Sequence, residues 1–297
     1  MSSEARMKQL KGKQLIEERN QREEKEEMKR NDIVNALVVR GYKAEARETI
    51  KNGVVFEGIV VRSDEPIAPV IYTQGLIDEA ERRGTPLSEV VEQVIRIYET
   101  NKNIDFDVDD FFDREFVLSH IRIGLQRDSC QDLVRKSSHY EGIEEYLFIK
   151  GEPGYYVKLH TGHLEKAGVQ EEEAWSSAER NTFAETKIRS MAQVMSGMTG
   201  HGYDPEEDAD PAIYVITNSD ACYGASAVLD VEAIRVFFRP KNINKVIVLP
   251  SSVHEMLLVP ANFAPGMDEL NAMVREINAT QVAPEERLTD RAYVLNL

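Results

Sequence analysis

The segment Pro250–Glu255 places serine, histidine and glutamate within a few positions of one another. A serine acts as a nucleophile when a histidine takes its proton and a carboxylate orients that histidine. In a regular strand, neighbouring side chains point to opposite faces, so Ser252 and His254 can share a face that Glu255 cannot join. A complete local triad is therefore not expected. The alternative is a tight connection between two strands, in which Ser251 and Ser252 form the turn and His254 bonds to the sheet edge.

A second polar run, Asn218–Ser226, directly follows the apolar segment Ile213–Thr217. Loops that leave the ends of strands often carry ligand-contacting groups. Four side chains of this run are hydrogen-bond donors or acceptors: Asn218, Asp220, Tyr223 and Ser226. Gly224 permits a close approach of the backbone. The plainer interpretation is a connection in which Asp220 or Ser219 only caps the next helix.

Metal and cofactor motifs are incomplete or missing. His160 and His163 flank a turn, but a stable zinc site needs three or four protein ligands and neither cysteine lies nearby in the sequence. The acidic run Asp105–Asp110 resembles the start of a calcium loop, yet it lacks the required glycine, and Phe116 stands where the loop needs glutamate. Phosphate-binding loops, dinucleotide-binding glycine patterns and metalloprotease helices are absent from the sequence. We predict no metal and no cofactor.

Apolar periodicity and turn residues predict the elements that position these groups. Thr85 and Pro86 open the clearest helix, because threonine caps helices and proline suits the first helical position. Helices are expected at Ile33–Val38, Leu87–Tyr98, Asp109–Ile121, Glu171–Phe183 and Met267–Ile277. Strands are expected at Val54–Val61, Ile67–Tyr72, Tyr146–Lys150, Tyr155–His160, Ile213–Thr217, Lys245–Leu249, Val253–Val259 and Ala292–Leu295. Hairpins mixed with helices predict an α+β fold with a largely antiparallel sheet.

Composition divides the chain into three parts. Residues 1–30 are charged or polar almost throughout and predict a solvated helical arm, because they lack an apolar stripe wide enough to pack. Residues 31–140 form a mostly helical N-terminal part. Residues 141–297 form an α+β part that carries both polar runs.

The overall charge restricts the possible partners. A net charge of −16 over 297 residues opposes binding of nucleic acid through a broad surface. An acidic decoy of a nucleic-acid-binding protein is a minor alternative, because lysine and arginine are interleaved with the acids. The longest apolar runs have the length of strands, and the N-terminus shows no apolar run like a signal peptide. With two cysteines in the chain, these features predict a soluble cytoplasmic protein without membrane or direct nucleic-acid partners.

Several short segments share the pattern of one family. They are Asn31–Val34, Pro69–Tyr72, Ala178–Thr182, Tyr214–Asn218, Tyr223–Ser226, Leu249–Glu255 and Glu276–Val282. In this order they resemble a domain-of-unknown-function family of anaerobic, gut-type Gram-positive bacteria, from about residue 30 to the C-terminus. The resemblance implies a bacterial cytosolic setting and supplies no activity. It singles out Asn218, the Tyr-Gly-Ala-Ser unit and the Pro-Ser-Ser-x-His-Glu unit, whereas Cys222 is not part of this signature.

Two functional hypotheses of different classes follow. The first is a binding or regulatory module whose loops at residues 218–226 and 250–255 form a polar cleft for a small ligand, a peptide or a protein. The second is a hydrolase-type enzyme in which His254 is the base for a nearby serine or a water. The candidate catalytic residues are His254, Glu255, Ser252 and Ser226, and the candidate ligand-binding residues are Asn218, Asp220, Tyr223, Ser226, Ser251 and His254. The missing catalytic signature favours the binding module.

Overall fold

The computed structural model describes residues 30–62, 70–101, 109–129, 131–151, 155–200 and 212–297. The chain divides into two compact units, Met1–Lys51 with Val55–Phe106, and Asn52–Val54 with Asp107–Leu297. The predicted arm lies outside the described residues except for Arg30, and so do Cys130 and the predicted hairpin turn at residues 152–154. Residue 140, where composition predicts a boundary, lies inside the second unit. As a division between independently folding parts, that boundary stays a prediction.

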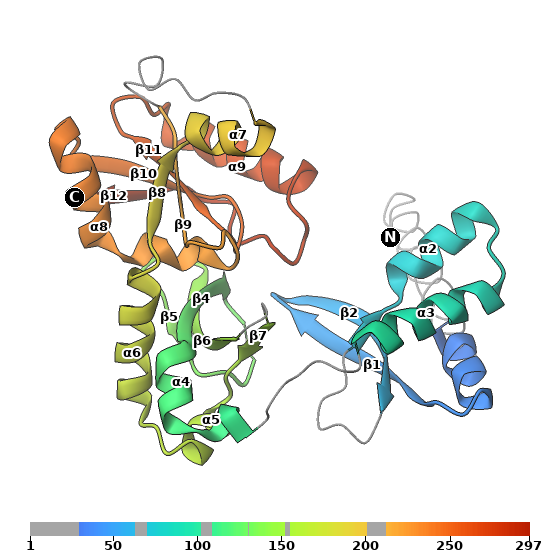
Figure 1. The fold of residues 1–297 in the computed structure, drawn as a ribbon. Coiled ribbons are helices and arrows are strands. Elements are labelled where there is room, and N and C mark those ends of the chain that lie inside the picture. The colour runs from blue at the N-terminus through green and yellow to red at the C-terminus, as the bar shows by residue number, and fades with distance from the viewer. Residues whose placement is uncertain (1–29, 63–69, 102–108, 130, 152–154, 201–211) are drawn as a thin grey trace, which may run out of the picture. The chain divides into compact units, whose positions relative to one another are not determined.

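The first unit joins a three-stranded sheet, in the order β1-β2-β3, to three helical segments (Figure 1). Its elements are a helix at residues 30–39, β1 (Lys43–Lys51), β2 (Val54–Arg62), β3 (Val70–Tyr72), α2 (Gln74–Arg83) and α3 (Leu87–Asn101). Ile33, Leu37, Ile59 and Val91 are among the buried side chains of its core. As predicted, α3 follows Thr85 and Pro86 and buries one apolar face.

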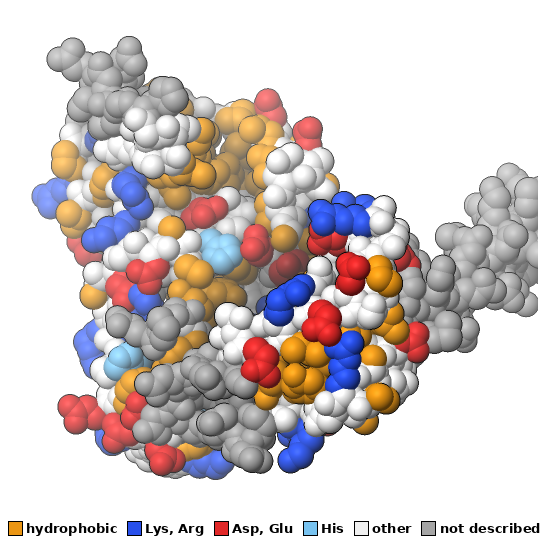
Figure 2. Space-filling model, turned by 45° about the vertical axis from the view of Figure 1, so that its right-hand side comes forward, with side chains coloured by type: hydrophobic (Ala, Val, Ile, Leu, Met, Phe, Trp, Pro, Cys, Tyr) orange, Lys and Arg blue, Asp and Glu red, His pale blue; other side chains and the backbone are white. Residues whose placement is uncertain are grey.

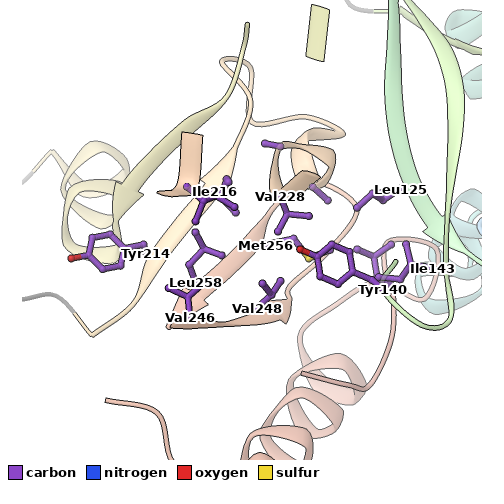
Figure 3. Close-up of a cluster of buried hydrophobic side chains, with 14 of the residues drawn as sticks. Leu125, Tyr140, Ile143, Tyr214, Ile216, Val228, Val246, Val248, Met256 and Leu258 are labelled. Atoms are coloured by element: carbon purple, nitrogen blue, oxygen red, sulfur yellow. The ribbon is translucent and has the colours of Figure 1, made fainter. Parts of the chain in front are cut away.

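A five-stranded antiparallel sheet in the order β12-β10-β11-β9-β8 organises one half of the second unit. Its strands are β8 (Lys187–Ser190), β9 (Tyr214–Thr217), β10 (Lys245–Pro250), β11 (Met256–Pro260) and β12 (Tyr293–Asn296). Alternate residues of β10 face opposite sides, so Val248 packs with Ile216 and Leu258 while Ile247 faces the other way. Figure 3 shows the first of these two clusters. It is closed by η2 (Gly224–Leu229) and α8 (Val231–Phe238), and the second cluster is closed by α9 (Met267–Thr280).

A smaller antiparallel sheet forms the other half of the second unit. Its strands are β4 (Ile121–Arg127), β5 (Arg135–Ser137), β6 (Ile143–Gly151) and β7 (Tyr155–Lys158), and β6 pairs with all three others. Helices α4 (Arg114–His120) and α6 (Glu171–Phe183) lie along it in Figure 1, and α6 packs on β4. The remaining elements are η1 (Asp109–Phe112), α5 (Thr161–Lys166), α7 (Met191–Thr199) and η3 (Arg239–Lys241).

The opposite face of this small sheet carries polar and aromatic side chains. On β6 these are Tyr146, Phe148 and Lys150, because alternate residues of a strand share a face. Arg122 of β4 and Lys158 of β7 lie directly opposite Phe148 in the strand register, so their side chains belong to the same face. This face borders the loop at residues 218–226.

The predicted α+β fold is confirmed, with antiparallel pairing in each sheet. One predicted helix, Asp109–Ile121, is wrong as a single element. The side chain of Asp113 accepts a hydrogen bond from the Phe116 amide and caps a new helix, and Ile121 already begins β4. The predicted strand Val253–Val259 starts only at Met256, so the segment before it is an irregular loop.

In the described part of the chain, no helix combines the length and the apolar character needed to cross a bilayer.

Gly124 provides a test of the packing in the small sheet. A Cβ atom at this position would lie 2.4 Å from Cζ of Tyr146, whose ring is buried. We expect Gly124→Ala to lower the free energy of unfolding by about 1–3 kcal/mol through overpacking. Urea denaturation followed by the fluorescence of Trp175, the single tryptophan, measures this change.

Gly162→Ala in α5 is the matched control, because its Cβ would meet nothing within 4 Å. It should leave stability unchanged or raise it slightly. Equal denaturation midpoints for the two variants would contradict the close contact between Gly124 and Tyr146.

Candidate functional site

The structure brings the two polar loops of the sequence together. The backbone N–H of Tyr223 donates a hydrogen bond to Nδ1 of His254 at 3.1 Å. The carbonyl oxygen of His254 accepts two more bonds from the other loop, from the Thr217 hydroxyl at 2.7 Å and from the Gly224 amide at 3.0 Å. Residues 31 positions apart in the sequence are thus held at one end of the five-stranded sheet.

Asn218 organises the loop that follows β9. Its buried side chain accepts hydrogen bonds from the amides of Asp220 and Cys222, both at 3.2 Å, and donates one to the carbonyl of Cys222 at 2.8 Å. These three bonds within the loop make Asn218 a positioning residue. The bonds of Asn218 fix the shape of the loop, and its predicted ligand-binding role stays a prediction.

Two non-glycine residues of this loop have left-handed backbone conformations, Ala221 with φ 52° and Tyr223 with φ 50°. Such a conformation is unfavourable for a bulky L-residue and persists only where the surroundings enforce it. Gly224 completes the constraint, since a Cβ there would lie 2.3 Å from the Thr217 hydroxyl and 2.5 Å from the Asn218 amide. Backbone strain of this kind gathers at functional sites, which motivates a functional role for the loop.

The left-handed turn directs the ring of Tyr223 onto the polar and aromatic face of the small sheet. Ring centroids are 4.9 Å apart for Tyr223 and Tyr156, 6.1 Å for Tyr223 and Phe148, and 5.3 Å for Tyr223 and His254. We call these four rings the aromatic platform. Within the platform, the Phe148 ring is buried, whereas the other three rings remain partly exposed. Three of the four rings therefore form a partly exposed aromatic surface.

Tyr156 is held in its neutral form. Burial is the main cause that raises the pKa of its hydroxyl above the usual range, and a hydrogen bond with Cys222 adds to the effect. The phenol is thus a stable O–H group and no candidate for a base. Cys222 is a free, partly buried thiol in contact with it.

A chain of alternating charges runs along one side of the platform. Asp220 pairs with Lys150 at 2.6 Å, Lys150 pairs with Glu185 at 3.0 Å, and Glu185 pairs with Arg122 at 2.8 Å. Burial alone would lower the pKa of Lys150, but its hydrogen bonds to Asp220 and Glu185 outweigh burial and raise it. Asp220 therefore ties the loop to the small sheet instead of capping the helix that follows.

His254 faces a carboxylate on the other side of the platform. Because its Nδ1 accepts the Tyr223 amide, the ring proton of the neutral form resides on Nε2, which lies 3.4 Å from Oε1 of Glu286. The backbone of Glu286 also holds this loop, since its carbonyl accepts the Val253 amide at 2.8 Å. The hydrolase hypothesis allows Glu255, Asp220 or another acid to orient His254, and the acid at this place is Glu286.

The serines near His254 do not contact its ring. Ser252 accepts a hydrogen bond from the backbone amide of His254 at 3.0 Å, and the hydroxyls of Ser251 and Ser252 lie 3.0 and 3.4 Å from Glu255. Ser226 is buried in η2. Among the described residues, no serine hydroxyl hydrogen-bonds to either ring nitrogen of His254, so the geometry of a Ser-His nucleophile is not formed.

Sequence reasoning missed several residues of this site. The alternation within the predicted strand Tyr146–Lys150 already places Phe148 and Lys150 on one face, and Tyr156 follows from the next strand of the predicted hairpin. Glu286 has no such signal, because it lies in an irregular segment after α9.

A buried acid lies further along the same sheet face. Glu144 accepts hydrogen bonds from Gln126 at 2.6 Å and Ser129 at 2.5 Å and pairs with Arg135 at 2.8 Å. Burial acts to raise the pKa of Glu144, but the bonds from Ser129 and Gln126 and the charge of Arg135 outweigh it and lower the pKa. Elsewhere in the described chain, as here, no group of three histidine, cysteine or acidic side chains is arranged to hold a metal ion.

Removing the Asn218 side chain should loosen the strained loop. Asn218→Ala leaves two amides without their acceptor, and we expect the free energy of unfolding to fall by about 1–3 kcal/mol. Hydrogen exchange should accelerate most at the amides of Asp220 and Cys222, as measured by NMR. Asn218→Asp keeps an acceptor and should retain part of the protection. Unchanged exchange in the alanine variant would contradict the positioning role.

Acid should weaken the protein partly through Glu144. Its folded-state pKa lies below the unfolded value, so its contribution is present above the unfolded pKa, about 4.3, and is lost as the pH falls through the folded value. In urea denaturation at stepwise lower pH, Glu144→Gln should lose less stability than the natural protein. Glu179→Gln removes one exposed carboxylate as the control. Parallel pH curves for the natural protein and Glu144→Gln would contradict this assignment.

Comparison with known proteins gives a family and no activity. No curated protein and no solved structure matches the chain. The model of a family of unknown function, DUF5688, matches residues 23–296, a range that includes both loops and every residue of the aromatic platform. The chain belongs to this family of unknown function, DUF5688.

Proposed function

We propose that this protein is a binding module that holds a small molecule or a peptide side chain with a planar ring on the aromatic platform. The observation that carries the proposal is the strained Tyr223, whose backbone conformation and hydrogen bond to His254 fix a partly exposed ring against Tyr156. Rigid aromatic side chains supply contact area at low entropic cost, which suits them to recognition.

The polar groups around the platform support a ligand with hydrogen-bonding ends. The Nε2–H of His254 and the carboxylate of Glu286 lie on one side, and the ion pair of Lys150 with Asp220 lies on the other. Binding sites commonly combine an apolar surface with a few fixed polar groups that set orientation. A ring flanked by an amide or a hydroxyl satisfies both requirements.

A hydrolase role has less support from the geometry. Nδ1 of His254 is occupied by the Tyr223 amide, and Nε2 faces Glu286 instead of a hydroxyl. An acidic decoy has little support as well, because Figure 2 shows basic and acidic side chains interspersed over the face in view. A surface that imitates the phosphates of nucleic acid would require acidic side chains in a continuous row, without basic side chains between them. We also propose a bacterial cytosolic setting for this module, which the resemblance to proteins of anaerobic Gram-positive bacteria supports.

N-acetyl-tyrosinamide is a suitable probe for the platform. We expect its addition to shift the NMR signals of Tyr156, Tyr223 and the His254 ring in a saturable way, whereas N-acetyl-alaninamide should not. Tyr223→Ala should weaken binding about tenfold through the lost ring contacts. Tyr223→Phe keeps the ring and should bind nearly as the natural protein does.

Phe112→Ala is the control for a partly exposed ring outside the platform. It should leave binding of the tyrosine amide unchanged. Equal responses to both amides, or full binding by a folded Tyr223→Ala variant, would refute the proposed site.

A further inference from the structure

A polar pocket of about 870 Å³ lies between α4 and α6, away from the aromatic platform. Its lining residues are Asp113, Arg114, Glu115, Leu118, Ser119, Glu173, Ser176, Ser177 and Arg180. The floor is rigid, because the Asn181 amide donates to the carbonyls of Leu118 and Ile121 and so fastens the end of α4 to α6. A volume of this size lies within the range of pockets that hold small ligands.

Most charges in the pocket are already neutralised within the protein. Arg114 pairs with Glu173 at 2.5 Å and also donates to the Gly168 carbonyl at 2.6 Å. Asp113 is occupied as the cap of α4, where it accepts the Phe116 amide at 2.7 Å. These three side chains hold the pocket together and leave little capacity for a ligand.

Besides Arg114, Glu173 and the capping Asp113, the pocket has two charged side chains, Arg180 and Glu115, and neither has a charged partner among the described residues. The guanidinium of Arg180 donates to the hydroxyls of Ser176 at 3.0 Å and Ser177 at 2.9 Å, and no carboxylate of the described chain forms an ion pair with it. The carboxylate of Glu115 forms no hydrogen bond or ion pair with the described residues. Apart from Asp113, which is occupied as the cap of α4, the pocket therefore has one unpaired charge of each sign among the described residues.

The hydroxyls of Ser176 and Ser177 hold the guanidinium of Arg180 in a position that suits binding of an oxyanion. Because each hydroxyl oxygen accepts from Arg180, its own proton points away from the guanidinium, and both hydroxyl-bearing residues line the pocket although Ser177 is otherwise buried. The guanidinium is fixed by these bonds and keeps further N–H donors free, which suits a planar carboxylate. Holding the group in place in advance reduces the entropy lost on binding.

We propose that this pocket binds a short zwitterionic peptide. The terminal carboxylate lies on Arg180 with the hydroxyls of Ser176 and Ser177, and the terminal ammonium faces Glu115. A free anion such as phosphate suits the pocket less well, because the carboxylates of Asp113, Glu115 and Glu173 line it and repel a second negative charge.

Titration calorimetry with trialanine tests this proposal. Binding of trialanine with free ends should weaken about tenfold when the carboxylate is amidated and about tenfold when the amine is acetylated. Arg180→Gln should reproduce the effect of amidation, and Glu115→Gln that of acetylation. Arg180→Gln should bind the free and the amidated peptide with equal affinity, because its contact with the carboxylate is already lost. Glu115→Gln should likewise bind the free and the acetylated peptide with equal affinity.

Arg180→Lys is the matched variant, since it keeps the charge and loses the fork of donors, and it should bind with intermediate affinity. Inorganic phosphate serves as the competing probe. Binding of phosphate without trialanine would overturn the peptide assignment, and so would equal affinity for the free and the amidated peptide. Absence of any trialanine binding by the natural protein would overturn the site. None of these results depends on the aromatic platform.

Discussion

The hydrogen bond from the Tyr223 amide to Nδ1 of His254 determines the arrangement of the candidate site. It fixes the orientation of the imidazole, settles which of its nitrogens carries the proton and holds the Tyr223 ring on the small sheet. The bond exists only because Tyr223 has a left-handed backbone conformation and because Gly224 leaves room for Thr217 and the Asn218 backbone. Backbone strain in the loop at residues 218–226 thus helps to hold the five-stranded sheet and the small sheet of the second unit together.

Periodicity and turn chemistry were enough to predict much of the fold. The helix Glu171–Phe183 has the bounds that its apolar spacing predicts, and the apolar strands β9 and β10 differ from their predicted bounds by one residue. Strand β1 was missed, since its side chains are mostly charged and exposed and show no apolar alternation. The Asn52-Gly53 pair that joins it to β2 is a strong hairpin signal and could have revealed it. The helix expected at Asp109–Ile121 was wrong because apolar spacing continues across Asp113. The cap at Asp113 is a local interaction that this spacing does not report, and the start of β4 depends on its pairing with β6.

The site could be predicted only in part, for a related reason. The types of Tyr223 and His254, and their places at strand ends, were visible in the sequence. Their mutual contact depends on the pairing of β9 with β11, which local patterns do not determine. The partner of His254 was least accessible, because Glu286 reaches it from an irregular segment without periodicity. The irregular segment before Met256 also removed the strand geometry on which the sharing of a face by Ser252 and His254 depended.

The chain of ion pairs from Arg122 to Asp220 has a consequence for how the loop responds to its surroundings. Its inner member, Glu185, is 20% exposed, whereas the outer member, Asp220, is 43% exposed. Dissolved ions screen exposed charges far more than shielded ones, so added salt weakens the attachment of Asp220 before it disturbs the inner pairs. The contacts between the rings do not depend on charge. Ionic strength therefore acts as a graded control on the freedom of the loop, while the ring contacts of Tyr223 are left in place.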